Sequence, residues 1–406
     1  MSDILDHYVE HSLRPSLQPN RIGYQLSLRK YTSMNDIQVK PLPPQKREKV
    51  NWEQVWKPLL EKARWAPSGD NGQPWRVIPG TCDFSAQVVL DNSQKLAFLD
   101  FQGEASRIAI GGFLENLTVL ATCHGYAFHI GDTASSKPDN FSTNIWLEPL
   151  DNITIDPLSN FVGHRHSNRK PQLTKPLPTA IIQTLEAASE NGIRAKFISD
   201  RKKIDILADA AAIADRVRFT HLNCHEEFHE KVRWTKQEAV ENPAGFSVET
   251  FEINSIEKLA LRATKKFQVL RLADRWFRMG NVAANAARRQ VVNSSTIGAL
   301  IGNPTAKFSW VNVGRSLQRI WLQATAHDLG FQVLAVAPFL SRRFQLEGER
   351  GFEPWQSKCL GDVNSLLNQV FGDHEIAIMF RVGPAKPASA RTGRHSWKQL
   401  VQKNET

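Results

Sequence analysis

The sequence has few cysteines and no long apolar run, and these two absences exclude several classes of protein. Its four cysteines lie far apart and form no CxxC pair, so neither a zinc ribbon nor a disulfide framework is indicated. No window approaches the roughly 18 consecutive apolar residues that a membrane-spanning helix needs. The N-terminus carries Asp3, Asp6 and Glu10, where a secretory signal would be basic and then apolar. We therefore expect a cytoplasmic protein.

The sequence also lacks the common short motifs of nucleotide, acyl and protease chemistry. It contains no GxGxxG after an expected strand, no P-loop motif, no GxSxG and no HExxH. A Rossmann dinucleotide site, phosphoryl transfer on a P-loop and hydrolase acyl transfer therefore lose their usual support. The chain has 406 residues, 41% of them apolar and 23% charged, which is typical of a soluble globular protein with two or three domain-sized units.

Positive charge is concentrated in two segments. The net charge is +10, residues 262–289 hold eight basic residues against one acid, and residues 384–406 hold five against one. A basic, aromatic-bearing helix over 259–279 is typical of a nucleic-acid or membrane-surface element. Because no nucleic-acid module accompanies the charge, we expect neither partner and favour an ordinary amphipathic helix. Its inward side chains would be Leu259, Ala263, Phe267, Leu270 and Phe277.

Hydrophobic periodicity predicts an α+β protein that begins near Asn51, after a polar arm and linker over residues 1–50. The predicted helices cover residues 59–65, 106–124, 178–190, 204–230, 255–289 and 314–328. The predicted strands cover residues 75–78, 144–147, 194–198 and 375–382. The apolar run 334–340 has the length of a core strand.

Parts of this pattern recur, which indicates an internal repeat. The segment from Gly112 to Tyr126 resembles the one from Gly314 to Phe331 in helical phase. The helix, turn and strand near residues 60–75 likewise resemble those near 185–195. Coincidence between two short units is the alternative, and we favour two diverged copies of one α+β unit.

Three histidines, His221, His225 and His229, share one face if their segment is helical. Such a face could ligate a metal. Metal sites usually draw ligands from more than one element, so we expect a solvated helix surface here and no metal.

A turn rich in small and polar residues, APSGDNGQPW, joins the first predicted helix to the first strand. Pro67 and Pro74 fix the turn, and Ser68, Asn71 and Gln73 offer hydroxyl and amide groups. This loop suits the polar edge of a flat heterocycle.

A second cluster, GHRHSNR, holds two arginines that flank a hydroxyl. Arg165, Ser167 and Arg169 point the same way if the segment is extended, and together they form a site for a phosphate or a delocalised anion. Either cluster alone is consistent with an ordinary turn or a charged strand. Their presence in one chain is the stronger signal.

The two clusters together resemble the FMN-dependent nitroreductase family. The turn from Pro67 to Trp75 is similar to its PS-x-x-N-x-QPW signature, and Arg165 to Arg169 is similar to its R-x-S-x-K/R flavin segment. The helix at 314–328 resembles the family's central helix. The strand at 375–382 and the arginines of the tail resemble its closing strand and tail. The resemblance covers most of the chain after the arm.

The resemblance implies a nitroreductase-like α+β fold, a mixed β-sheet flanked by helices, in which two diverged repeats form an internal pseudodimer. The implied parts are a first half over 51–160, a second half over 161–383 with a helical lid over about 204–293, and a basic tail over 384–406. The turn also resembles that of a nitroreductase domain sometimes fused to a ThiF-like adenylating domain, which this sequence lacks.

The resemblance further implies one FMN site per chain. Arg165 and Ser167, with Arg391 or Arg394, would hold the phosphate, and Arg169 would lie near the N1/O2 edge of the flavin. The implied cofactor-binding residues are Pro67, Ser68, Gly69, Asn71, Gln73, Arg165, His166, Ser167, Arg169, Ala337, Arg391 and Arg394. The backbone N–H near Ala337 would meet flavin N5.

The second copies of both clusters are degenerate. The turn at 188–192 lacks GlnProTrp, and the segment from Gln25 to Arg29 has Gln25 in place of the first arginine. For this reason we expect one intact site, built from the turn of the first half and from the arginine segment and tail of the second.

The implied activity is hydride transfer from NADH or NADPH through FMN to a small, aromatic or conjugated acceptor. Because the flavin carries this chemistry, no catalytic protein residue is expected. The alternative is a flavin-binding or flavin-sequestering protein without turnover, and a third hypothesis is nucleic-acid binding by the basic helix. We expect a small-molecule substrate and a monomeric pseudodimer or weak homo-oligomer.

Overall fold

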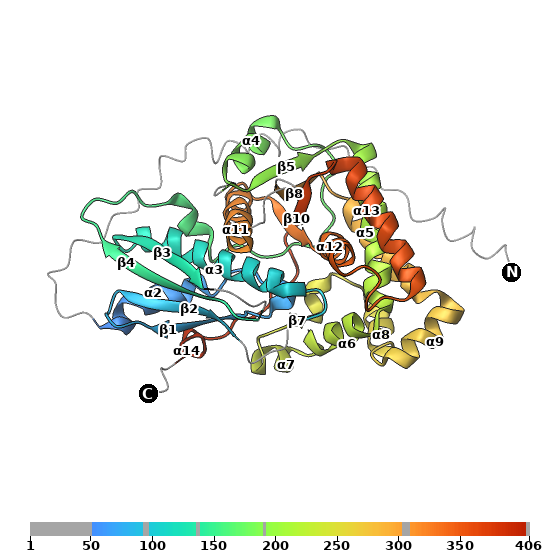
Figure 1. The fold of residues 1–406 in the computed structure, drawn as a ribbon, viewed down its shortest axis with the longest axis horizontal. Coiled ribbons are helices and arrows are strands. Elements are labelled where there is room, and N and C mark those ends of the chain that lie inside the picture. Colours follow the sequence, from blue (N-terminus) through green and yellow to red (C-terminus); the bar gives the residue numbers. More distant parts are fainter. Residues whose placement is uncertain (1–50, 92–96, 135–138, 190–191, 303–308, 403–406) are drawn as a thin grey trace. The chain divides into compact units, whose positions relative to one another are not determined.

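The computed structural model describes residues 51–91, 97–134, 139–189, 192–302 and 309–402. The N-terminal arm, including the expected arginine copy from Gln25 to Arg29, lies outside these residues, as do Glu190 and Asn191 of the second turn. The described residues form an α+β arrangement of two four-stranded sheets and the helices that flank them (Figure 1). None of the helices described is long and apolar enough to cross a membrane.

The first sheet has the strand order β1-β2-β4-β3, and every neighbouring pair is antiparallel. Its strands are β1 (Trp75–Pro79), β2 (Ser85–Leu90), β3 (Tyr126–Ala134) and β4 (Ser142–Pro149). Burial alternates along β2 and β4, so one face of the sheet meets the core. Helices α2 (Trp52–Ala63) and α3 (Glu104–Thr122) share that core with it.

The second sheet has the order β5-β8-β10-β9, again antiparallel throughout. Its strands are β5 (Arg194–Ile198), β8 (Thr296–Gly302), β9 (Gly330–Leu334) and β10 (Glu375–Gly383). The two central strands are buried almost continuously, because helices cover both faces of the sheet.

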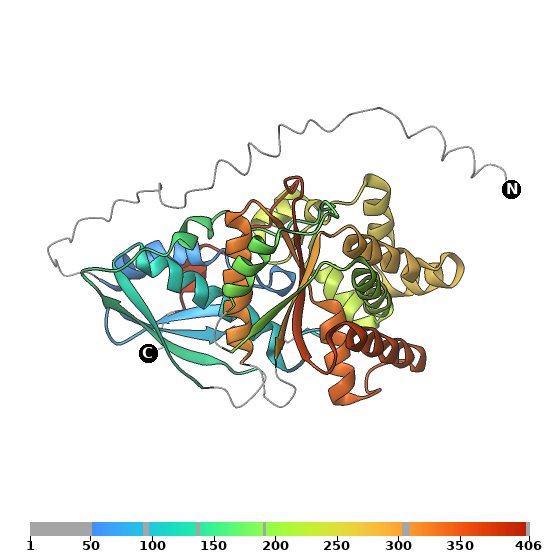
Figure 2. The ribbon, with the colours of Figure 1, turned by 90° about the horizontal axis from the view of Figure 1, so that it is seen from above.

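The helices around the second sheet belong to two separate cores. One core holds α5 (Arg201–Thr220), α12 (Val336–Glu347) and α13 (Pro354–Phe371). The other holds α4 (Thr179–Ala187) and α11 (Trp310–Ala326). Helix α11 also contributes Val311, Leu322 and Ala326 to the core of the first sheet, and both views place it between the two sheets (Figure 1, Figure 2).

A run of short elements lies between α5 and β8, and we call residues 222–292 the lid segment. Its elements are α6 (Leu222–Lys231), β6 (Val232–Arg233), α7 (Lys236–Glu241), β7 (Phe246–Ser247), α8 (Ser255–Ala263), α9 (Phe267–Phe277) and α10 (Met279–Val292). Helix α5, which the sequence analysis includes in the insertion, buries its apolar face under the second sheet instead.

The last described residues, up to residue 402, lie at the edge of the first sheet. Helix α14 (Trp397–Leu400) packs its buried Trp397 and Leu400 into the core of the first sheet. Val401 then forms a parallel bridge with Val77 of β1. The expected mixed sheet is therefore two antiparallel sheets, the first with this one parallel bridge at its edge. The tail after β10 thus crosses from the second sheet to the first.

Most predicted elements are present, but two long predicted helices are interrupted, and the apolar run 334–340, which has the length of a core strand, divides between two elements. The predicted helix 204–230 is two helices, because His221 has extended backbone angles. The predicted helix 255–289 is three helices, broken after Ala263 and at Arg278, whose φ is 51°. The run 334–340 is not a strand, since β9 ends at Leu334 and α12 begins at Val336. Pro338 sits in the first turn of that helix, where no N–H is needed.

The predicted inward face of the basic helix was also wrong in part. Leu270 is fully buried, but Leu259 is 69% exposed and Phe277 is 75% exposed. Ala263 is exposed as well, and Phe267 is half-buried. The breaks between α8, α9 and α10 change the helical phase, so side chains that share one face of a continuous helix diverge here.

Helices α3 and α11 cross in direct backbone contact at two glycines. A Cβ atom on Gly111 would lie 2.0 Å from the carbonyl oxygen of Val311, and one on Gly314 would lie 2.0 Å from the carbonyl oxygen of Ile108. No side chain fits in either place, because real Cβ contacts are never that short. The crossing therefore requires glycine on both helices.

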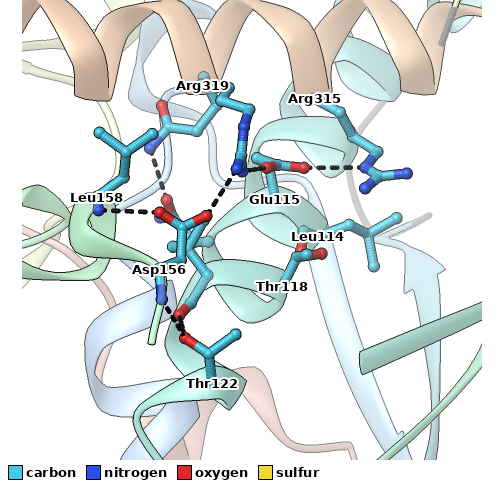
Figure 3. Close-up of polar contacts among 11 residues, drawn as sticks. Leu114, Glu115, Thr118, Thr122, Asp156, Leu158, Arg315 and Arg319 are labelled. Carbon is cyan, nitrogen blue, oxygen red and sulfur yellow. Dashed lines mark hydrogen bonds and ion pairs between the residues drawn. The ribbon is translucent and has the colours of Figure 1, made fainter. Parts of the chain in front are cut away.

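Buried polar groups surround this crossing (Figure 3). The carboxylate of Glu115, 1% exposed, pairs with Arg315 at 3.0 Å and with Arg319 at 2.6 Å. Arg319 also reaches Asp156 at 2.6 Å, and Asp156 accepts the backbone N–H of Leu158 at the start of η5 (Pro157–Phe161). A buried carboxylate is tolerated only when it is paired in this way.

Gly111→Ala should loosen the helix crossing and destabilise the protein. The added methyl group must push the two backbones apart, and overpacking of this kind costs about 1–3 kcal/mol. Gly361→Ala in α13 is the matched control, because nothing lies within 4 Å of its Cβ position. We expect that control to be neutral or more stable by about 0.5–1 kcal/mol. Urea unfolding measures both, and equal stabilities would contradict the required contact.

Candidate functional site

A cavity of about 520 Å³ collects residues from many separate parts of the chain. Its walls include the turn at 67–71, the segment at 165–169, the start of α12, the lid segment and the tail at 390–394. Helices α3 and α11 contribute Ile108 and Trp321 near their crossing. Of the predicted site residues, all but Gln73 line this cavity.

The turn between α2 and β1 has an unusual backbone. Asp70, Asn71 and Gln73 have φ values of 50°, 54° and 52°, in the left-handed region that Asn and Asp tolerate better than Gln does. Three contacts hold Gln73 there. Its N–H donates to Ser68 Oγ at 3.0 Å, its Oε1 accepts from the His395 N–H at 2.9 Å, and its Nε2 donates to the Asn71 carbonyl at 3.3 Å. Gln73 is 1% exposed and shapes the turn from behind instead of facing the cavity.

Asn71 joins the turn to two distant segments. Its Nδ2 donates to the carbonyls of Pro243 and Gly245 in the lid segment at 2.8 and 3.1 Å, and to the carbonyl of Gly393 in the tail at 3.2 Å. Its Oδ1 is buried and has no hydrogen-bond partner in the part of the chain that the structure describes. That oxygen is an acceptor available to a ligand N–H.

Arg165, Arg391 and Arg394 form a cluster on one wall. Arg165 donates to the Trp65 carbonyl at 2.7 Å and lies 4.4 Å from the ring centre of Trp321. Arg391 donates to the carbonyl of Arg165 at 3.0 Å and stacks on the Trp65 ring at 3.8 Å. Arg394 donates to the carbonyl of Ala66 at 3.1 Å. Carbonyls and aromatic faces therefore hold these guanidiniums in place.

The cluster lacks the negative charge that buried cations need. Among the described residues, none of the three arginines forms an ion pair with a carboxylate, and Arg165 Nε and Arg394 Nε have no hydrogen-bond partner. Burial, with repulsion from Arg394 and Arg391, holds the pKa of Arg165 well below its usual range. Burial, with Arg391 and Arg64, lowers the pKa of Arg394 to about 9. Such a site favours a multiply charged anion.

Ser167 and His166 lie beside this cluster and line the cavity as well. His166 Nδ1 is 2.8 Å from the His164 carbonyl. The neighbouring Asn168 points the other way, because it is buried and donates to the Lys386 carbonyl at 2.9 Å. Arg165, Ser167 and Arg169 thus all line the cavity, as the expected alternation requires, but His166 between them lines it too.

Arg169 faces the lid segment. It donates to the carbonyl of Thr250 at 3.0 Å and lies 5.7 and 5.8 Å from the ring centres of Phe246 and Phe251. Burial lowers its pKa, although Asp70 and Glu252 oppose that shift. This arginine places a positive charge under an aromatic roof.

Arg381 on β10 supports Arg169 from behind, and the sequence analysis did not find it. It is fully buried and donates to the carbonyls of Asn168 and Lys170 at 3.2 and 3.0 Å, and to Gln332 at 2.7 Å. Burial and Arg169 lower its pKa to about 10. The signal that could have revealed it is a lone cation in the otherwise apolar second half of the strand EIAIMFRVG.

A second charged group on the cavity wall was also missed. Asp70 of the turn faces Arg218 of α5, which pairs with Asp215 at 2.7 Å. Burial raises the pKa of Asp70, although Arg218, Lys231 and Arg169 partly oppose the shift. Asp70 lies inside the quoted turn motif, but Arg218 and Asp215 come from α5, which no motif marks.

The start of α12 completes the wall. Ala337 is 3% exposed and lines the cavity in the first turn of that helix. Backbone N–H groups of a first turn have no partner within the helix, and Pro338 has no N–H at all. Ala337 is therefore positioned to offer its N–H to a ligand.

The three histidines at the end of α5 and on α6 are not a solvated face, and that prediction was wrong. His221, His225 and His229 are 8%, 1% and 4% exposed. His221 Nε2 lies 2.7 Å from the Gly351 carbonyl, and the rings of His225 and His229 are 4.4 Å apart. Within the described residues, no group of three or more His, Cys, Asp or Glu side chains could hold a metal.

The comparisons with known proteins give distant similarities. No family model matches the chain. An uncharacterised protein of Mycobacterium tuberculosis (strain CDC 1551) is 23% identical over 344 residues, which are 83% of this chain and 47% of that protein. The chain thus spans about half the length of the curated relative it matches.

The similar solved structures include FMN-dependent nitroreductases. One is NfnB from Mycobacterium smegmatis in complex with NADPH, at 13% identity, with 60% of this chain and 97% of that chain covered and a TM-score of 0.33. Another is iodotyrosine deiodinase bound to FMN and 3-iodo-L-tyrosine, at 13% identity, 59% and 95% coverage and a TM-score of 0.32. A third is a nitroreductase with bound FMN from Bacteroides fragilis, at 8% identity. It is matched with 59% of this chain and 94% of that chain covered and a TM-score of 0.31.

Inorganic phosphate should stabilise the ligand-free protein, because it supplies the charge that the arginine cluster lacks. Thermal unfolding in phosphate, compared with chloride at equal ionic strength, should give a higher midpoint that saturates with concentration. Arg165→Ala and Arg394→Ala should remove most of this gain, and the exposed Arg350→Ala should keep it. A gain that is the same in all four proteins would contradict an anion site at the cluster.

Asp70→Asn should stabilise the ligand-free protein at neutral pH. Because burial raises the pKa of Asp70, the folded state binds that proton more tightly than the unfolded state does, and stability is lost as pH rises through the raised pKa. The substituted Asn side chain does not ionise, so the variant does not lose stability in this way as pH rises. Asn also tolerates the left-handed backbone as well as Asp does.

Thermal unfolding from about pH 4 to pH 8 tests this expectation. The advantage of Asp70→Asn should be greatest at the upper end and should vanish towards pH 4. Asp205→Asn, on the exposed side of α5, is the matched control. A gain that does not change with pH would assign the effect to packing instead.

Proposed function

We propose that the chain binds FMN in this cavity and acts as an oxidoreductase of the nitroreductase type. One observation carries the proposal: three clustered arginines, of which Arg165 is 2% exposed, form no ion pair with a described carboxylate and share a single cavity with an amide-bearing turn. This pairing suits a ligand that has a phosphate at one end and a flat polar heterocycle at the other. The sequence motifs of both walls support the same assignment.

The proposed contacts follow from the walls. Arg165, Arg391 and Arg394 would bind the phosphate, with Ser167 as a further donor. Ser68, Gly69 and the free Oδ1 of Asn71 would face the polar edge of the ring system. Arg169 would place its charge beside the heterocycle, where negative charge is stabilised by a nearby cation. Gln73 and Arg381 would act as positioning residues behind these contacts.

The chain's own contribution is position, electrostatics and exclusion of water. When bound, FMN supplies the ability to accept hydride from NADH or NADPH and to pass reducing equivalents to an acceptor. Phe228, Phe246 and Phe251 of the lid segment give the cavity an apolar roof, which excludes water and favours stacking of a flat, conjugated acceptor. No acid, base or nucleophile of the chain is required.

We further propose that the two halves are diverged copies that form an internal pseudodimer. The two sheets support this, because each is built in the sequence helix, strand, strand, helix, strand, strand and has the same antiparallel order. Helix α5, the lid segment, α12 and α13 are additions of the second half. A pseudodimer of this kind needs no second chain to complete its site.

The contacts at the helix crossing support the same proposal. Exchanging Gly111 with Gly314 and Ile108 with Val311 converts one glycine contact into the other. The same exchange, continued one turn along both helices, converts the Asn116–Gln318 hydrogen bond into the Glu115–Arg319 ion pair. Reciprocal contacts are the signature of a two-fold axis. These contacts pair Gly111 with Gly314. The sequence comparison instead pairs Gly112 with Gly314, so the two alignments differ by one residue.

A flavin-holding protein without turnover is the alternative function, and one observation favours it. Asn71 bonds the turn to both the lid segment and the tail, and Gln73 bonds the turn to the tail through His395. These contacts tie the roof to the wall of the cavity. A roof held shut would keep substrates away from a bound flavin.

The purified protein should carry one FMN per chain. Its visible spectrum and the mass of the chromophore released on denaturation measure this content. Arg165→Ala combined with Ser167→Ala should lose the flavin, because the phosphate loses a cation and a hydroxyl donor. Arg350→Ala is the charge-matched control and should keep it. Full FMN content in the double variant would overturn the site assignment.

Stopped-flow mixing with NADPH separates the two functions. An oxidoreductase should bleach the flavin absorbance within seconds and recover it with a quinone or nitroaromatic acceptor. A flavin-holding protein should keep its flavin oxidised for minutes. Asn71→Ala, which cuts the three bonds to the lid segment and the tail, should speed reduction only in the second case.

A further inference from the structure

The lid segment carries apolar side chains that face outward instead of inward. Helices α8 and α9 present large apolar side chains to solvent, and five of them are more than 60% exposed. Their exposed fractions are 80% for Ile256, 69% for Leu259, 62% for Leu272, 72% for Trp276 and 75% for Phe277. Large apolar groups exposed together on a protein surface usually mark an interaction site.

We call the surface that these five side chains form the outer face. Ile256 and Leu259 are three residues apart on α8, and Leu272 and Trp276 are four apart on α9, so each pair forms one stripe. The other sides of α8 and α9 face the cavity or the protein interior. Ala260 and Leu261 line the cavity, and Leu270 is fully buried. The outer stripe therefore has no role in packing the lid segment.

Positive charge surrounds the outer face. Six exposed basic residues lie on or beside α8 and α9, and they are Arg262, Lys265, Lys266, Arg271, Arg275 and Arg278. None of the six forms an ion pair within the described part of the chain. Asp274 of α9 accepts the backbone N–H of Gly280 at 2.6 Å at the start of α10, and Glu257 of α8 lines the cavity. The outer face thus combines exposed apolar groups with unneutralised cations.

We propose that the outer face docks on an anionic lipid surface. Short helices with Trp, Phe and Leu on one side and Lys and Arg around them insert shallowly at the boundary between headgroups and acyl chains. The cations add attraction to anionic headgroups. This inference departs from the expectation of no membrane partner, and it concerns attachment at the surface only.

Two other occupants fit the outer face less well. A second copy of the chain would bring the same patch against itself about a two-fold axis. The six cations of one copy would then lie against the six of the other, and their repulsion would weaken the contact. A nucleic acid would match the cations, but it offers nothing to Ile256, Leu259 and Leu272, since nucleic-acid interfaces are polar. The aliphatic side chains therefore decide in favour of lipid.

The inference goes beyond the proposed function and does not depend on it. Because α8 has the cavity on one side and the outer face on the other, lipid would hold the lid segment by the side opposite the site. Docking would not require that the cavity hold flavin. Vesicle binding and flavin content can therefore fail separately.

Flotation with vesicles tests the inference on the full chain. We expect wild type to float with vesicles of phosphatidylcholine and phosphatidylglycerol in a 3:1 ratio, to bind pure phosphatidylcholine at least about tenfold more weakly, and to be released by salt. Trp276→Ser combined with Phe277→Ser removes apolar groups, and Arg271→Gln combined with Arg275→Gln removes charge. Each pair should weaken binding by about tenfold.

Two matched controls change the same residue types elsewhere. Val240, on α7, is 80% exposed, so Val240→Ser tests a general loss of surface apolarity. Arg194→Gln combined with Arg350→Gln removes two exposed cations away from the outer face. Both controls should float like wild type. Equal thermal midpoints and equal FMN content in all variants would show that folding and the cavity are unaffected.

Several outcomes would overturn the inference. One is a wild type that does not float with the anionic vesicles, and another is a pair of outer-face variants that float as well as the controls. Sedimentation equilibrium that shows a dimer dissociated by the Trp276 and Phe277 substitutions would assign the face to a second copy. Salt-sensitive retention on duplex DNA that depends on Arg271 and Arg275 but not on Trp276 would assign it to nucleic acid.

Discussion

The contact of two helix backbones at Gly111 and Gly314 determines the distance between the two halves of the molecule, and the cavity depends on that distance. Helix α3 supplies Ala105 and Ile108 to the cavity, and α11 supplies Leu317 and Trp321. The Trp321 ring supports the guanidinium of Arg165. A wider crossing would separate that arginine from the turn, and the two walls would no longer face one ligand. Close packing therefore transmits a constraint from two glycines to the charged wall.

The molecule treats buried charge in two different ways. Around Glu115, each buried carboxylate and guanidinium has an opposite partner, so the charges cancel and the crossing is stabilised. At Arg165, Arg391 and Arg394, carbonyls and tryptophan rings hold the cations but leave their charge in place. The second arrangement costs stability in the free protein, because three like charges lie close together and one of them, Arg165, is buried. Such a cluster is suited to an anion.

The sequence could predict the local elements and the residue types of the site, but not the way in which distant segments meet. The periodicity of α3 and α11 is visible, whereas their crossing depends on a reciprocal glycine contact that no single segment reveals. The turn and the arginine segment are recognisable as motifs, so Ser68 and Arg165 could be selected. Arg381, Arg218 and Asp215 act from a strand and a helix without a motif, and only the fold brings them to the cavity. The lid segment was mispredicted because Arg278 and the residues after Ala263 break a pattern that reads as one helix.

The proposed duplication has an evolutionary consequence at the crossing itself. In a homodimer, one gene encodes both sides of the two-fold axis, so a carboxylate on one side faces an identical carboxylate on the other. Here the positions of Glu115 and Gln318 correspond, and so do those of Asn116 and Arg319, yet each pair consists of different residues. Fusion lets selection change one side without the other, and an ion pair can then replace a symmetric amide contact. The same freedom lets one of two ancestral sites be lost while its partner acquires a lid.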